Sequence, residues 1–136
     1  MDENMKGYIA NIEKLTLENN NFRKVLYTAR HSQLVLMSLL PGEEIGEEIH
    51  KLDQFLRVEK GTGNVVIDGG ETAIGDGSAI FVPAGAKHNV INTSSDQPLK
   101  LYTIYSPPEH QDGIVRKTRA DALAEKEHFD GQTSET

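Results

Sequence analysis

Short apolar runs alternate with turn-forming residues over most of the chain. The turns are indicated by Gly, Pro, Asp and Asn, as at Pro41-Gly42 and at Asp68-Gly69-Gly70. Many short strands at this spacing favour an all-β sandwich or a closed barrel. The predicted strands span residues 22–28, 33–40, 45–50, 54–58, 64–68, 79–82, 88–92 and 99–105.

Helix is predicted only near the C-terminal end of the chain. Thr118 and Asp121 stand at the spacing of a capping box, which would open a helix extending to about Glu127. No linker or internal repeat divides the sequence into two domains. We therefore expect a polar lead-in over residues 1–21, a β-barrel domain over residues 22–108, and a helix with a flexible tail over residues 109–136.

Composition narrows the class of protein. The 136 residues are 37% hydrophobic and 26% charged, which is typical of one soluble globular domain. The formal net charge of -7 would repel a phosphate backbone, so nucleic acid is not an expected partner. The sequence contains no cysteine, which excludes disulfides, thiolate metal sites and cysteine nucleophiles.

The N-terminal residues are acidic and lack the basic and apolar segments of a secretory signal. No apolar stretch approaches the ~20 residues that span a bilayer. We therefore expect a cytoplasmic protein that has no membrane partner and binds a small-molecule ligand.

The most specific pattern in the sequence is a set of glycine, proline, histidine and asparagine residues at fixed spacing. Gly77, Pro83, Gly85, His88 and Asn92 are separated by five, one, two and three residues. The turn at Pro83 and Gly85 would reverse the chain, so that His88 begins a strand with its ring facing the barrel. This pattern resembles the second motif of the cupin family at every fixed position.

The first cupin motif is a glycine, a His-x-His pair, a glutamate and a second glycine. Laid on this chain from Gly42, its frame gives Glu48, His50, Gln54 and Gly61 with every spacing kept. Glu48 stands where the family has its first histidine, and Gln54 stands where it has glutamate. Two of the three ligand positions in this motif are therefore changed.

With the strand pattern included, the resemblance to the cupin family extends over residues 22–106. It implies an all-β double-stranded β-helix, or jelly-roll barrel, with a short C-terminal helix. Small cupins commonly form homodimers, often by exchanging an N-terminal strand, so the lead-in is a candidate for that interface. The chain also resembles the short cupins grouped with mannose-6-phosphate isomerase.

Four side chains are candidate ligands of a divalent metal ion. Glu48 and His50 are two residues apart, so both point to one face of a strand, and Gln54 shares their parity if the strand register is kept. His88 comes from a different strand, so the four can converge. Two imidazoles and one carboxylate suit Zn, Mn or Fe, with the glutamine carbonyl as a weak fourth ligand. The alternative is a polar pocket that binds an organic ligand and no metal.

Two further residues are candidates for the pocket wall. Tyr102 and Tyr105 lie on opposite faces of one predicted strand, so at most one of them faces the pocket, and Tyr105 is the candidate. His110 follows the last barrel strand and could close over the mouth. Arg57 has the parity of Phe55, outside the ligand face.

The sequence leaves three functions open. The first is a metal-dependent, isomerase-like enzyme acting on a small polar or sugar-like substrate, in which Glu48, if it is not a ligand, would be the base. No cluster of Lys or Arg marks a phosphate site for such a substrate. The second function is a non-haem iron oxygenase, and the third is a non-catalytic module that binds a sugar or other small molecule. The fold alone does not decide among them.

Overall fold

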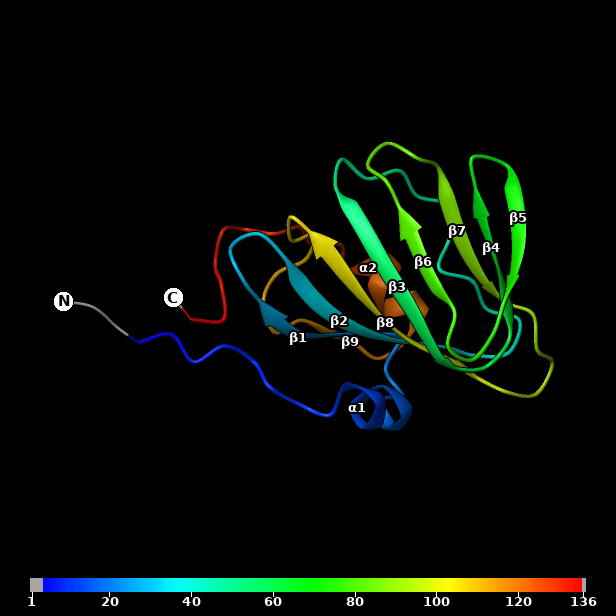
Figure 1. The fold of residues 1–136 in the computed structure, drawn as a ribbon, viewed down its shortest axis with the longest axis horizontal. Helices are drawn as coiled ribbons and strands as arrows, with labels where there is room; N and C mark the ends of the chain where they lie inside the picture. The colour runs from blue at the N-terminus through cyan, green and yellow to red at the C-terminus, as the bar shows by residue number, and fades with distance from the viewer. Residues whose placement is uncertain (1–3, 136) are drawn as a thin grey trace.

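A computed structural model describes residues 4–135 of the chain (Figure 1). Residues 1–3 of the predicted lead-in and residue 136 of the predicted tail lie outside the described residues. The described part forms two antiparallel sheets that share one core, with a short C-terminal helix, so the predicted all-β jelly-roll barrel is confirmed. The elements in chain order are α1 (Ile12–Glu18), β1 (Arg23–Thr28), β2 (Gln33–Leu39), β3 (Asp53–Lys60), β4 (Gly63–Ile67), β5 (Gly70–Ile74), β6 (Ala79–Val82), β7 (His88–Asn92), β8 (Leu99–Ser106), β9 (Val115–Arg116) and α2 (Arg119–Ala124).

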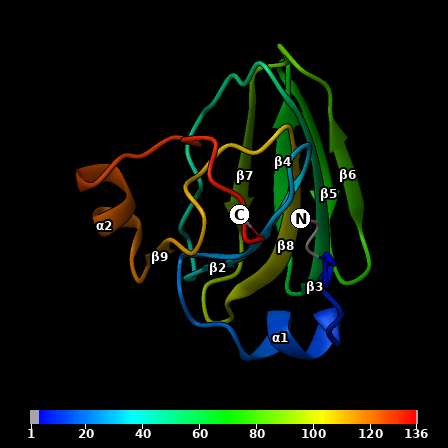
Figure 2. The ribbon, with the colours of Figure 1, turned by 90° about the vertical axis from the view of Figure 1, so that its left-hand side faces the viewer.

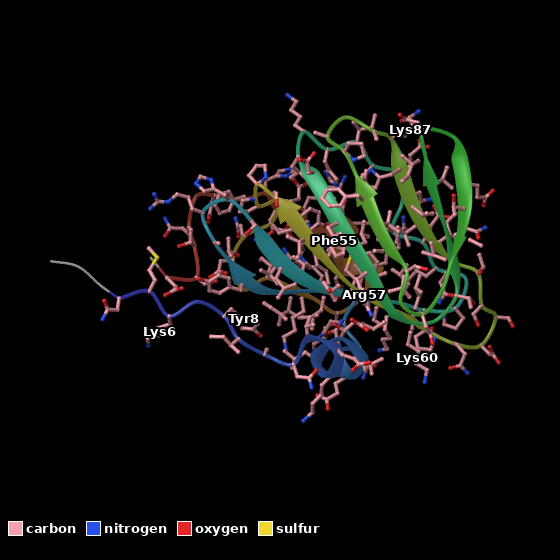
Figure 3. All side chains as sticks on the ribbon, in the orientation of Figure 1. Lys6, Tyr8, Phe55, Arg57, Lys60 and Lys87 are labelled. Atoms are coloured by element: carbon pink, nitrogen blue, oxygen red, sulfur yellow. The ribbon has the colours of Figure 1, made fainter. Side chains whose placement is uncertain are left out.

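The larger sheet has the strand order β6-β3-β8-β2-β1-β9, and the smaller sheet has the order β5-β4-β7. Side chains alternate between the core and the outer face of the larger sheet, as the period of a strand requires. On β3, Gln54 and Leu56 are buried, whereas Phe55 and Arg57 lie on the outer face (Figure 3). The predicted parity of Arg57 is therefore confirmed.

Buried aliphatic side chains of the two sheets fill the space between them. Leu101 on β8 is fully buried in the larger sheet, and Val65 on β4 and Val90 on β7 are buried in the smaller one. These residues belong to one continuous apolar cluster. Because such packing is dense, the side chains at its rim are held in fixed positions.

Three strands differ from the sequence prediction, one of them the two-residue strand β9, which was not predicted. Residues 45–50 are not a regular strand. The chain instead makes isolated bridges to β7 at Glu44 and Glu48, because Gly46 between them takes a positive φ of 112° that interrupts the ladder. β5 was not predicted, since only Ile74 in it is buried and the other residues show no apolar pattern. It forms because its backbone pairs with β4.

The lead-in contains a helix, so the prediction that helix occurs only near the C-terminal end is wrong. Asn11 caps α1 by accepting a hydrogen bond from the backbone of Lys14 at 3.1 Å. Thr16 is the buried residue of this short helix, and one buried position gives no visible apolar period. α1 contacts β8 and β3, and the Lys100 ammonium group donates to the carbonyl of Asn19 just after it.

At the other end, Thr118 caps α2 as predicted, since its hydroxyl accepts from the backbone of Asp121 at 3.0 Å. The helix ends at Ala124 rather than near Glu127, because the chain then turns back toward the barrel. Among the described residues, neither α1 nor α2 is long and apolar enough to cross a membrane.

Residues 134–135 of the predicted flexible tail lie against β1 and the N-terminal segment. The backbone of Ser134 donates to the carbonyl of Thr28 at 2.9 Å. The Glu135 carboxylate accepts from the backbone of Lys6 at 2.6 Å, from that of Gly7 at 2.9 Å and from the Tyr27 hydroxyl. Figure 1 accordingly shows the segment that precedes α1 and the segment that follows α2 close together at one side of the larger sheet.

Candidate metal centre

The segment before β3 places Glu48 directly opposite His88. The backbone of Glu48 donates to the carbonyl of His88 at 2.8 Å, and the backbone of His88 donates in return at 2.9 Å. Directly opposed residues of an antiparallel pair have side chains on the same face about 5 Å apart. A single backbone bridge therefore brings these two side chains together, although a regular strand was predicted here.

The side chains of Glu48, His50 and His88 form one group. Each offers a ligand atom, and these atoms all lie within 4.8 Å of one another. Oε1 of Glu48 lies 3.3 Å from Nε2 of His50, and the two imidazole centres are 5.3 Å apart. Ligands bound at about 2.1 Å to one ion lie roughly 3.0 to 3.5 Å from each other. The spacing of the carboxylate and the first imidazole therefore suits a single divalent ion.

Gln54 joins this group from β3. Its amide Nε2 donates to Oγ1 of Thr103 at 3.0 Å, and its Oε1 lies 3.1 Å from Nε2 of His88. Nδ1 of His88 lies 3.0 Å from the carbonyl of Ala86, which only accepts, so Nδ1 carries the proton. Nε2 of His88 and Oε1 of Gln54 thus lie side by side, and an imidazole nitrogen and an amide oxygen are both ligand types for a divalent ion. The residues present therefore fit a metal ion.

Electrostatic contacts keep the Glu48 carboxylate negatively charged, which favours the binding of a cation. Burial alone would raise the pKa of Glu48, but the hydrogen bond from His50 and the nearby charges of His50, Arg23 and His88 lower that pKa below its ordinary value. Burial alone would lower the pKa of His50, but Glu48 and Glu109 raise it above its ordinary value. Glu48 is therefore ionised at neutral pH.

A cavity of about 530 Å³ opens above this group, with Glu48 and His50 in its wall. Its cover is formed by the chain that follows β8, including α2, which Figure 2 shows outside the two sheets beside β9. The cavity-lining residues of this cover are Glu109, His110, Arg119, Ala122, Leu123, Lys126, Glu127 and His128.

The structure places both predicted pocket residues near the metal group. His110 is buried, its Nδ1 lies 3.1 Å from the Glu127 carboxylate, and its Nε2 has no hydrogen-bond partner among the described residues. Burial lowers the pKa of His110, although Glu127 opposes this effect, so the ring is neutral. Tyr105 is buried and does not line the cavity, but its ring centre lies 6.0 Å from that of His50 and 5.2 Å from that of His110. Tyr102 instead contacts Phe55 on the outer face, as its parity predicts.

Comparison with known proteins identifies the family. Residues 35–105 match the cupin domain. The chain belongs to the cupin family. This cupin is 49% identical over 130 residues to the uncharacterized protein YrkC of Bacillus subtilis (strain 168), which covers 90% of the chain and 69% of YrkC. It is 46% identical to the crystal structure of BH2720 from Bacillus halodurans, with a TM-score of 0.86 and coverage of 91% of this chain and 98% of that one.

A sequence relative of this cupin also occurs outside the bacilli. The uncharacterized protein L612 of Acanthamoeba polyphaga mimivirus is 44% identical over 112 residues, covering 79% of this chain and 70% of L612. Because the BH2720 likeness covers 91% of the chain, it extends well outside the matched cupin domain, into the segments that flank the barrel.

Sequence reasoning missed five charged residues of the cavity: Arg23, Glu109, Arg119, Lys126 and Glu127. Arg23 begins β1 on the buried face that it shares with Val25, so alternation along that strand was the signal that could have found it. Glu127 contacts His110, which lies 17 positions earlier in the sequence, so no local sequence pattern indicates this contact.

Proposed function

We propose that this cupin binds one divalent metal ion through Glu48, His50 and His88, with Gln54 as a weak fourth ligand. We further propose that it is a metal-dependent enzyme acting on a small polar or sugar-like substrate held in the cavity. The observation that carries this proposal is the convergence of three ligand atoms within 4.8 Å, two of their residues being in the cavity wall.

The donor set suits a reactive metal rather than a structural one. One carboxylate and two neutral imidazoles leave a divalent ion with a net charge near +1, and fewer than six protein ligands leave positions for substrate. A bound metal would supply Lewis-acid polarisation of a substrate carbonyl or hydroxyl oxygen.

His110 is the residue best placed to move a proton. Its Nδ1 is hydrogen-bonded to Glu127, which fixes the ring and leaves the lone pair at the buried Nε2 without a hydrogen-bond partner among residues 4–135. In an isomerase-like reaction, Nε2 takes a proton from one substrate carbon and returns it to the adjacent carbon, while a hydroxyl proton passes between the two oxygens. Glu48 belongs to the metal group, so the role of base passes from Glu48 to His110.

A second candidate function rests on the same ligands. Two histidines and one carboxylate are the facial set of non-haem Fe(II) oxygenases. The two reactions differ in what they consume, because an isomerase uses no oxygen and an oxygenase cannot proceed without it. Resemblance to the mannose-6-phosphate isomerase group favours the first.

Metal analysis of the purified protein tests the site. We expect about one Zn, Mn or Fe per chain, lost in His88→Ala and kept in His31→Ala, which removes an exposed histidine outside the cavity lining. Stoichiometric metal in His88→Ala would show that the ligand set is wrong. Absence of metal from the wild type, with a small molecule still bound, would instead support the non-catalytic binding module.

Two assays separate the chemistries on the metal-loaded protein. Isomerase-like proton transfer predicts that dihydroxyacetone, a minimal hydroxyketone, takes up deuterium from D₂O without consuming oxygen. His110→Gln should reduce this exchange at least tenfold while the metal content stays unchanged. Oxygen uptake by the Fe(II)-loaded protein with a phenol, and no deuterium exchange, would select the oxygenase.

We also propose that this cupin forms a homodimer through its N-terminal segment. The support is the exposure of two apolar side chains there, Met5 and Ile9, which are 75% and 91% exposed. Light scattering on the wild type and on Ile9→Glu tests this: the variant should be monomeric, and an unchanged mass would contradict the assignment.

A further inference from the structure

Arg23 is a buried cation for which the described part of the chain offers no anionic partner in contact. It is the first residue of β1, lines the cavity and is only 8% exposed. Within residues 4–135 its guanidinium group makes no hydrogen bond and no ion pair, and its Nε is fully buried. Its close contact is with the ring of Phe22, whose centre lies 5.4 Å from Cζ.

Of the four glutamates that line the cavity, Glu47 is exposed and the other three each have another partner. Glu48 is hydrogen-bonded to His50 and belongs to the metal group. Glu109 lies 3.6 Å from Nδ1 of His50. Glu127 is 3.1 Å from His110 and 3.4 Å from Arg116. The positive charge of Arg23 therefore stays uncompensated by direct contact with an anion.

A second guanidinium group lines the same cavity from its cover. Arg119 is the first residue of α2, and its Nε is also buried without a hydrogen-bond partner. Its Nη2 lies so close to Gly46 that a Cβ built there would be 3.0 Å from it. Gly46 thus leaves room for Arg119 beside the metal-binding segment. Arg23 and Arg119 come from different elements, 96 positions apart in the sequence.

An uncompensated buried charge is costly, and proteins rarely keep one unless something binds it. A guanidinium group presents its N–H donors as a planar fork that matches carboxylate and phosphate oxygens. A cavity of about 530 Å³ is large enough for a small ligand. These facts together describe an anion-binding position.

We propose that Arg23, assisted by Arg119, forms an anion subsite, so that the ligand of this cavity carries a carboxylate or phosphate group in addition to the oxygen presented to the metal. The substrate class therefore narrows to small anionic polar molecules, such as hydroxy acids or sugar phosphates. Anion binding at Arg23 stands by itself, but the substrate role rests on the proposed function.

Thermal unfolding of the full chain in increasing inorganic phosphate or malonate tests the subsite, with and without EDTA. We expect one or both anions to raise the melting temperature in both conditions. Arg23→Gln should lose this shift. Lys24→Gln, which removes an equal charge from the exposed neighbour on β1, should keep it. The anion with the lower half-saturating concentration identifies the group that the subsite takes.

The subsite would be overturned if added anion did not raise the melting temperature of the wild type, or raised that of Arg23→Gln equally. It would also be overturned if Arg23→Gln and Lys24→Gln lost the rise in melting temperature to the same extent. A shift that vanishes with EDTA and in His88→Ala but persists in Arg23→Gln would assign the anion to the metal and also overturn it. An Arg23-dependent shift in a protein that retains no metal would support the subsite while rejecting the metal-dependent function. Because Gln removes a buried charge, Arg23→Gln should be at least as stable as the wild type without anion, which separates lost binding from misfolding.

Discussion

The barrel wall beside the metal group and the cover of the cavity are built in different ways. Gln54, His88 and Tyr105 stand on barrel strands of five to eight residues that pair along their length. The cover has a strand of two residues and a helix of six, and it is held to the barrel by side-chain pairs such as His110 with Glu127. The sheets thus give rigid support to His88 and Gln54, and the bridge to His88 holds Glu48 against them. The shape of the cover, in contrast, depends on a few polar contacts.

The largest expected difference between the two regions is in stability. Leu101→Ala removes a fully buried side chain of β8 and should lower the free energy of unfolding by about 2 to 5 kcal/mol. Leu123→Ala removes a side chain of α2 that is 51% exposed, so it should change the free energy of unfolding by less than about 0.5 kcal/mol. Urea denaturation measures both, and equal losses would mean that the cover is part of the cooperative core.

Metal affinity should depend on the barrel residues that orient the ligands and not on the apolar side chains of the cover. Thr103→Val removes the acceptor that orients the Gln54 amide, so metal affinity should fall by about 10- to 100-fold. Thr103→Ser keeps the hydroxyl and should bind metal as the wild type does, and so should Leu123→Ala in the cover. Competitive metal titration measures the affinities. An unchanged affinity in Thr103→Val would remove Gln54 from the ligand set.

The smallest expected effect is the pH dependence of the cover. Burial lowers the pKa of His110. Burial alone would raise the pKa of Glu127, but the hydrogen bond from His110 and the charges of His110, Arg23 and Arg116 lower that pKa below its ordinary value. As pH falls below 6.5, the ordinary value for histidine, the unfolded chain takes up a proton that folded His110 does not, so stability is lost. Glu127 adds a further loss below its ordinary value of 4.5.

Urea denaturation at a series of pH values measures this effect. His110→Gln should lose less stability between pH 6.5 and pH 4.5 than the wild type does. His128→Gln, which alters a histidine whose side chain is 81% exposed, should behave as the wild type. Parallel curves for wild type and His110→Gln would place the acid sensitivity elsewhere.

The features that were predicted from the sequence are those that depend on short spacing. His88 and its neighbours follow from a turn and a strand start, and the motif residue Asn92 fixes the next loop by donating to the carbonyls of Leu39, Leu40 and Gln97. Gly61 is required because a Cβ there would lie 2.8 Å from the carbonyl of Pro98. Such constraints act over few residues and leave a visible pattern.

The features that were missed depend on contacts between distant segments. Arg23 and Arg119 line one cavity although they lie 96 positions apart, and Glu127 contacts His110 only after α2 turns the chain back. β5 has one buried residue and owes its pairing to β4. In each case the determining partner lies elsewhere in the fold, so neither alternation nor composition reveals it.

The contact between the two ends of the chain has a consequence for engineering this protein. Lys6 and Glu135 are joined by a hydrogen bond of 2.6 Å, so a short glycine-rich linker could connect them into one continuous backbone. New ends could then be opened at Gly69, in the exposed turn between β4 and β5, where φ is 85° and nothing packs within 4 Å of an added Cβ. A circular permutant of this kind would keep every proposed ligand in place while moving both termini to the far side of the smaller sheet.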